Sequence, residues 1–255
     1  MAHRDDRGSM SGSWSEALRR LGTAQKGHAR GAPAYSVYVN RRIGRVLAAT
    51  AYVWGLTPNA VTVISAAFTF TAIALMCVLP PSVAVGVLIA VLLVLGYAWD
   101  SADGQLARLQ GGGSVAGEWL DHFVDAIKIA SLHLAVLIGL FRFTDLPVPW
   151  LLIPIGFSVV AVVTFFGMLL NDLLKGKRGV TSTHARGGGT LRRSLLLLPT
   201  DFGLLCITFV LWGAPAAFLA VYGAIFVLCG GFLVLAAAKW FREMRAIDAA
   251  ATTGA

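Results

Sequence analysis

Four aspartates lie within a short segment of an otherwise apolar chain, in which 57% of residues are hydrophobic and 13% are charged. Asp100 and Asp103 are three residues apart, and Asp121 and Asp125 follow at a spacing of four. On helices, each pair projects from one face. Carboxylates gathered in an apolar setting repel one another unless cations compensate them. Because oxygen-only ligands favour Mg²⁺, Mn²⁺ or Ca²⁺ over zinc, this spacing predicts a divalent-cation site.

A glycine-rich reversal at 110–114 joins the two aspartate pairs. It makes their helices antiparallel neighbours, so the carboxylates can converge. Two divalent ions about 4 Å apart can hold a diphosphate during in-line displacement. Gly104, Ala107 and Gly117 leave room for such a ligand. Arg108 is a candidate either to bind a phosphate or to orient an aspartate.

The composition predicts an all-α integral membrane protein with six transmembrane helices. The chain has 255 residues and a mean hydropathy of +0.73. Its apolar runs are about 20 residues long, which is enough to cross a bilayer. The predicted spans are approximately residues 57–79, 83–108, 115–141, 146–174, 191–212 and 214–240. The net charge of +8 is attributed to topology and to contact with anionic headgroups, so no nucleic-acid partner is expected.

The segments before and after the spans differ in composition. Residues 1–33 are predicted to be a polar, mobile N-terminal arm with a short helix at 14–21, where Ser13 and Glu16 fit a capping box. Residues 34–56 mix aromatic and cationic side chains, which is typical of an amphipathic helix lying in the interface. Thr57 and Pro58 suit the start of the first span. The remaining predicted units are a six-helix catalytic domain at 57–240 and a C-terminal tail at 241–255.

The distribution of Lys and Arg predicts the orientation. Nine of the 21 cations precede Thr57, six lie at 175–193 and three at 239–245, whereas Arg142 alone occupies a loop on the opposite side. Both termini and the aspartates are therefore expected to face the cytoplasm. From Val83 to Asp100 a helix rises about 25 Å, so Asp100 is expected near one boundary of a hydrocarbon core about 30 Å thick.

The aspartate segment resembles a known signature. The string Asp100-x2-Asp103-Gly104-x2-Ala107-Arg108-x8-Gly117-x3-Asp121-x3-Asp125 matches, at every defined position, that of the CDP-alcohol phosphotransferase (CDP-alcohol phosphatidyltransferase) family. The resemblance implies cleavage of the diphosphate of a CDP-linked alcohol, release of CMP and transfer of the phosphoalcohol to an alcohol acceptor. It also implies two Mg²⁺ or Mn²⁺ ions on the four aspartates, membrane lipid as a partner, and a homodimer.

The resemblance also assigns roles to individual residues. Asp125 is the usual candidate for the catalytic base. His122 is an alternative, because an imidazole titrates near neutral pH. The order of Glu118, Asp121, His122 and Asp125 resembles the choline and ethanolamine phosphotransferase branch, where that His and Glu are likewise candidates for the base. The implied nucleotide-binding residues are Asn59, Thr62, Asp100, Gly104, Ala107, Arg108 and Gly117.

The acceptor site is predicted from cations. Lys128 is a candidate to bind substrate phosphate, with snorkelling or an ion pair as alternatives. Arg186, Arg192 and Arg193 suit either anionic headgroups or a phosphorylated acceptor such as inositol phosphate or glycerol phosphate. Family members that use those acceptors resemble one another in having Arg or Lys directly after the last aspartate. This chain has Ala126 there.

Two polar residues lie within the predicted spans. His133 is expected to be a hydrogen-bonded core residue, and Asp201 to be either functional or paired with Arg192 or Arg193.

The leading function is phosphatidyl transfer from CDP-diacylglycerol to a water-soluble alcohol or sugar phosphate, in phospholipid biosynthesis. The alternative is a soluble CDP-alcohol donor with a diacylglycerol-like acceptor. A divalent-cation transporter is the third, although transport would place the carboxylates near the bilayer centre.

Overall fold

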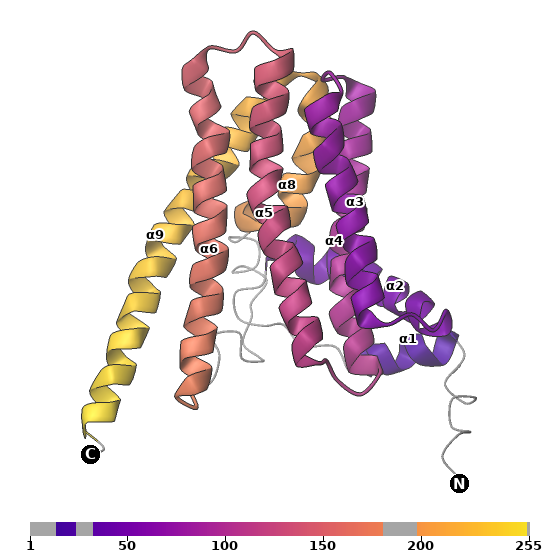
Figure 1. Ribbon diagram of the computed structural model, residues 1–255, viewed down its shortest axis with the longest axis vertical. Coiled ribbons are helices and arrows are strands. Elements are labelled where there is room, and N and C mark those ends of the chain that lie inside the picture. The colour runs from indigo at the N-terminus through magenta and orange to yellow at the C-terminus, as the bar shows by residue number, and fades with distance from the viewer. Residues whose placement is uncertain (1–13, 24–32, 181–197, 254–255) are drawn as a thin grey trace.

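The protein is helical throughout the part that the computed structural model describes, which is residues 14–23, 33–180 and 198–253 (Figure 1). No strand occurs among these residues, so the all-α prediction is confirmed. The longer elements are α1 (Trp14–Thr23), α2 (Arg41–Val53), α3 (Pro58–Val78), α4 (Val83–Leu109), α5 (Val115–Phe143), α6 (Leu152–Lys177), α8 (Phe202–Thr208) and α9 (Pro215–Thr253). The short helical segments are η1 (Ser36–Asn40), η2 (Val148–Leu151), η3 (Leu198–Thr200) and η4 (Phe209–Gly213).

Five described helices are long and apolar enough to cross a membrane, namely Pro58–Val78, Val83–Leu109, Val115–Phe143, Val148–Lys177 and Pro215–Ala250. The span predicted at 191–212 has a different form. Its described part is a shorter apolar segment, Phe202–Gly213, and residues 181–197 lie outside the described ranges. The helix begins only at Phe202 because Asp201 is its N-cap, whose carboxylate accepts a hydrogen bond from Gly203 N at 3.0 Å.

Hydroxyl side chains determine where the first three spans begin. Thr57 caps α3, which has Pro58 at its first position, as predicted. Ser82 caps α4 and Ser114 caps α5, each through a hydrogen bond from a backbone N–H three residues later. The reversal between α4 and α5 needs positive φ angles at Gly111 and Gly112, of 101° and 128°. These caps and this reversal set α4 antiparallel to α5.

The large core lies toward the end of the bundle away from the aspartates. Trp212, Phe218 and Tyr222 are fully buried there, among side chains of α3, α4 and α5. Gly139 of α5 allows close packing, because a Cβ at this position would lie 2.6 Å from Met76 O of α3 and 2.7 Å from Trp212 Cζ2. Helices α4 and α5, which carry the aspartates, therefore belong to a packed core that lies away from the aspartates themselves.

The helices at the N-terminus cover the other end of α4. Ala17 and Leu21 of α1 pack with Ala48 of α2 and Leu106 of α4 in a second buried cluster. Helices α1 and α2, the α4–α5 reversal and the C-terminal ends of α6 and α9 all lie at one end of the bundle (Figure 1). Asp201 adds a link, since its Oδ2 accepts a hydrogen bond from Ser36 N at 2.8 Å. The candidate partners Arg192 and Arg193 lie outside the described residues.

Candidate active site

The last turns of α4 and the beginning of α5 bring three carboxylates together. One oxygen each of Asp100, Asp103 and Asp121 lies within 4.8 Å of the other two. Asp103 is buried, whereas Asp100 and Asp121 are half-buried. The antiparallel arrangement of α4 and α5 therefore brings three of the four aspartates together, whereas the spacing predicts that all four converge.

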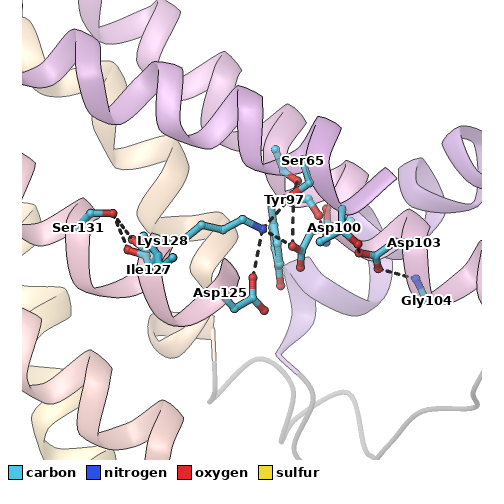
Figure 2. Close-up of polar contacts among 12 residues, drawn as sticks. Ser65, Tyr97, Asp100, Asp103, Gly104, Asp125, Ile127, Lys128 and Ser131 are labelled. Atoms are coloured by element: carbon cyan, nitrogen blue, oxygen red, sulfur yellow. Dashed lines mark hydrogen bonds and ion pairs between the residues drawn. The ribbon is translucent and has the colours of Figure 1, made fainter. Parts of the chain in front are cut away.

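Asp125 is connected to this group through Lys128. The ammonium of Lys128 donates to Asp125 Oδ1 at 3.1 Å and to Asp100 Oδ1 at 2.5 Å (Figure 2). It also donates to Ser65 Oγ of α3 at 3.0 Å. The structure thus shows Lys128 in the ion-pair arrangement, one of the alternatives open from the sequence. Its spacing of three from Asp125 was the available signal, but the contacts to α3 and α4 have no sequence signature.

Both oxygens of Asp103 accept hydrogen bonds. Thr62 Oγ1 of α3 donates to Oδ2 at 2.7 Å, and the backbone N–H of Gly104 donates to Oδ1 at 2.5 Å. Thr62 is itself buried, with 3% of its surface exposed. The carboxylate of Asp103 is therefore held in one orientation by groups from two helices.

The carboxylate of Asp121 differs from that of Asp103 in its hydrogen bonding. Its Oδ1 is buried and makes no hydrogen bond within the part of the chain that the structure describes. A buried carboxylate oxygen of this kind needs a partner, and the neighbouring ligand atoms are all carboxylate oxygens. Mg²⁺ and Mn²⁺ prefer such a donor set, so Asp100, Asp103 and Asp121 fit a divalent cation.

A cavity of about 720 Å³ opens beside the carboxylates, and Asp103 and Asp121 line it. Six of the seven predicted nucleotide-binding residues also line it: Asn59, Thr62, Gly104, Ala107, Arg108 and Gly117. The seventh, Asp100, belongs to the carboxylate group. A Cβ at Gly117 would lie 3.0 Å from Asn59 Oδ1, so glycine there allows α5 to approach the start of α3. The cavity therefore has carboxylates on one side and small or polar residues around it.

The other predicted site residues differ in their relation to this cavity. Glu118 lines the cavity, whereas the ring of His122 lies 6.3 Å from that of Phe165 on α6. His133 is a core residue as predicted, 2% exposed, with Nδ1 2.6 Å from the Tyr222 hydroxyl. The structure does not describe the positions of Arg186, Arg192 and Arg193.

The apolar helices and the carboxylate group together define a helical membrane protein with a candidate site for a divalent cation. The sequence pattern of CDP-alcohol phosphatidyltransferase matches residues 55–241, a range that contains all four aspartates and the cavity. The chain belongs to this family and is a CDP-alcohol phosphotransferase. This class of enzyme is distinct from the transporter considered above, so the transport hypothesis is set aside.

Solved structures that match the chain include two from Mycobacterium tuberculosis. Phosphatidylinositol phosphate synthase (PgsA1) in complex with manganese and citrate is 22% identical, with a TM-score of 0.48, and the match covers 80% of this chain and 89% of that one. The same synthase with CDP-DAG bound is 23% identical, with a TM-score of 0.47 and coverage of 77% and 90%. No curated protein sequence matches the chain.

Removal of the Thr62 hydroxyl is expected to lower turnover. In Thr62→Val, Asp103 Oδ2 loses the donor at 2.7 Å, and loss of a group that orients a metal-binding side chain costs about 10-fold to 100-fold in activity. Thr62→Ser should retain most of the rate. The measurement is CMP release, with Thr71→Val on the exposed face of α3 as the control. Equal rates for Thr62→Val and Thr71→Val would contradict this role.

Proposed function

We propose that this chain transfers the phosphatidyl group of CDP-diacylglycerol to a hydroxyl of a water-soluble acceptor and releases CMP. The observation that carries the proposal is the convergence of Asp100, Asp103 and Asp121 beside a cavity of about 720 Å³. The acceptor oxygen forms a bond to the β-phosphorus, the bond from that phosphorus to the CMP oxygen breaks, and the acceptor proton passes to a base. The product is a phospholipid.

The exposed surface beside the cavity supports a lipid-linked donor. Val115, Trp119 and Phe123 of α5 are 87%, 62% and 50% exposed, and the rings of Trp119 and Phe123 stack with centroids 4.9 Å apart. Glu118 and Asp121 lie between these apolar residues in the sequence of α5. Acyl chains can therefore lie against this apolar surface while the diphosphate enters the cavity.

The cavity residues have distinct roles in the proposed reaction. Asp100, Asp103 and Asp121 would hold the divalent cation, which when bound lowers the negative charge of the diphosphate. Arg108 lines the cavity and suits a phosphate oxygen. Asp125 is proposed as the base rather than His122, because Lys128 joins Asp125 to the carboxylate group whereas His122 packs near Phe165 of α6.

The reversed pairing of substrates is the second candidate. A soluble CDP-alcohol would then be the donor, and a diacylglycerol-like lipid would supply the hydroxyl. One observation favours it: Glu118, which the choline and ethanolamine phosphotransferase resemblance makes a candidate for the base, lines the cavity. Ala126 after the last aspartate also distinguishes the chain from the members that use inositol phosphate or glycerol phosphate.

Release of CMP by the purified protein tests the proposed donor. With Mg²⁺ or Mn²⁺, we expect CMP from CDP-diacylglycerol plus a soluble acceptor, and none from CDP-choline or CDP-ethanolamine plus diacylglycerol. The acceptor panel comprises free polyols and their phosphates, and Asp103→Asn is the inactive control. CMP from the soluble donors alone would establish the reversed pairing. No CMP from any donor would overturn both.

Both termini and the active site are proposed to face the cytoplasm. Cations gather on α1, α2 and the C-terminal ends of α6 and α9, which lie at the same end of the bundle (Figure 1), whereas Arg142 is at the opposite end. Alkaline phosphatase fused after Ala255 should therefore be inactive in a bacterial host, and the same enzyme inserted at 80–82 should be active. The reverse pattern would contradict this orientation.

A further inference from the structure

The Lys128 ammonium is held by three helices. Its three N–H bonds are all used, because it donates to Ser65 Oγ of α3, Asp100 Oδ1 of α4 and Asp125 Oδ1 of its own helix (Figure 2). The Lys128 side chain is only 9% exposed. A buried ammonium is stable where it is paired and fully hydrogen-bonded, and this position meets both conditions.

Ser65 shows that the position is built for a cation. Its hydroxyl donates to Gly96 O at 2.9 Å, with Asp100 Oδ1 as a second, longer acceptor at 3.3 Å, and its oxygen accepts from the Lys128 ammonium at 3.0 Å. Ser65 is fully buried. Gly96 permits the close approach of α3 to α4, because a Cβ there would lie 2.3 Å from Thr69 Oγ1 and 3.3 Å from Ser65 O. The packing of α3 against α4 thus places Ser65 Oγ as the third acceptor for the Lys128 ammonium.

The carboxylates are consequently divided between two kinds of cation site. Asp125 contacts Lys128, whereas Asp103 and Asp121 form an all-oxygen group with Asp100, their ligand atoms within 4.8 Å of one another. Asp100 belongs to both. A second divalent ion on Asp100 and Asp125 would have to lie beside the ammonium, where two positive charges repel.

We propose that Lys128 takes the place of a second divalent ion, so that the site binds one divalent cation, on Asp100, Asp103 and Asp121. The family resemblance implies two ions, and Lys128 provides the physical reason for the difference. The inference rests on the divalent-cation site of the proposed function. Lys128 is therefore a positioning residue that holds Asp100 and Asp125, and it leaves the substrate phosphates to other groups.

Counting bound Mn²⁺ tests the inference without turnover. The full chain in detergent is titrated with Mn²⁺ and followed by equilibrium dialysis and electron paramagnetic resonance. We expect one ion per wild-type chain and a six-line spectrum without exchange coupling. In Lys128→Met, which shortens the side chain by one atom and removes its charge, we expect a second ion and an exchange-coupled spectrum. Lys128→Arg, which keeps the charge, should bind one.

Several results would overturn the inference: two coupled ions in the wild type, or one ion in a folded Lys128→Met. If Lys128→Met does not fold, Asp125→Asn decides the question. We expect it still to bind one ion, because Asp125 is not a ligand, whereas fewer ions than in the wild type would contradict the proposal. Ion number and CMP release are separate measurements, so one bound ion without CMP supports this inference and counts against the proposed function. Two bound ions together with CMP release would contradict this inference and support the proposed function.

Discussion

Replacing Asp121 by asparagine is expected to abolish turnover. Its Oδ1 is buried and makes no hydrogen bond within the described ranges, and one of its oxygens lies within 4.8 Å of those of Asp100 and Asp103. An amide removes the charge, and either orientation of it offers the cation only one oxygen. Loss of one electrostatic group in an active site costs about 10²-fold to 10³-fold in rate. We expect at least that decrease in CMP release, together with weaker Mn²⁺ binding.

The matched control for this substitution is Asp145→Asn. Asp145 is exposed and follows α5 at the end of the bundle opposite the aspartates, so the same chemical change there should leave the rate unchanged. Circular dichroism and gel filtration of both variants would verify that the fold is intact. A near wild-type rate for Asp121→Asn would contradict the assignment of Asp121 to the cation site.

The parts of the fold that the sequence predicts correctly are those with local causes. Thr57, Ser82 and Ser114 are hydroxyl residues placed directly before apolar runs, and each caps a span. The segment predicted as a span at 191–212 differs, because apolar composition alone does not distinguish one long span from a shorter helix that begins at a buried cap. Asp201 provides that cap, and its second contact, to Ser36, joins segments distant in the sequence.

In the site, too, the features with local causes are predicted from the sequence, and those that depend on packing between helices are not. The spacing of the aspartates within each helix and the short reversal predict that all four converge, and Asp100, Asp103 and Asp121 do. The environment of Lys128 depends instead on how α3 and α4 pack. Ser65 contacts the ammonium from α3, and Gly96 of α4 permits the close approach of these two helices. The register between the helices that creates this contact has no signature in the sequence. The base is a similar case, because His122 and Asp125 are only three residues apart on one helix, and their spacing does not reveal that Asp125 contacts Lys128 whereas His122 lies near Phe165 of α6.

A comparison of Asp125→Asn with His122→Gln is expected to identify the base. The Lys128 ammonium connects Asp125 to Asp100, through contacts of 3.1 Å and 2.5 Å, whereas the His122 ring lies 6.3 Å from that of Phe165. General-base catalysis contributes about 10²-fold to 10⁴-fold, so Asp125→Asn should lower the rate by that amount while Mn²⁺ binding is retained. His122→Gln should stay within a few-fold of wild type and keep the acidic limb of the pH–rate profile. Loss of that limb in His122→Gln alone would assign the proton transfer to His122, because an imidazole accepts a proton only above its own pKa.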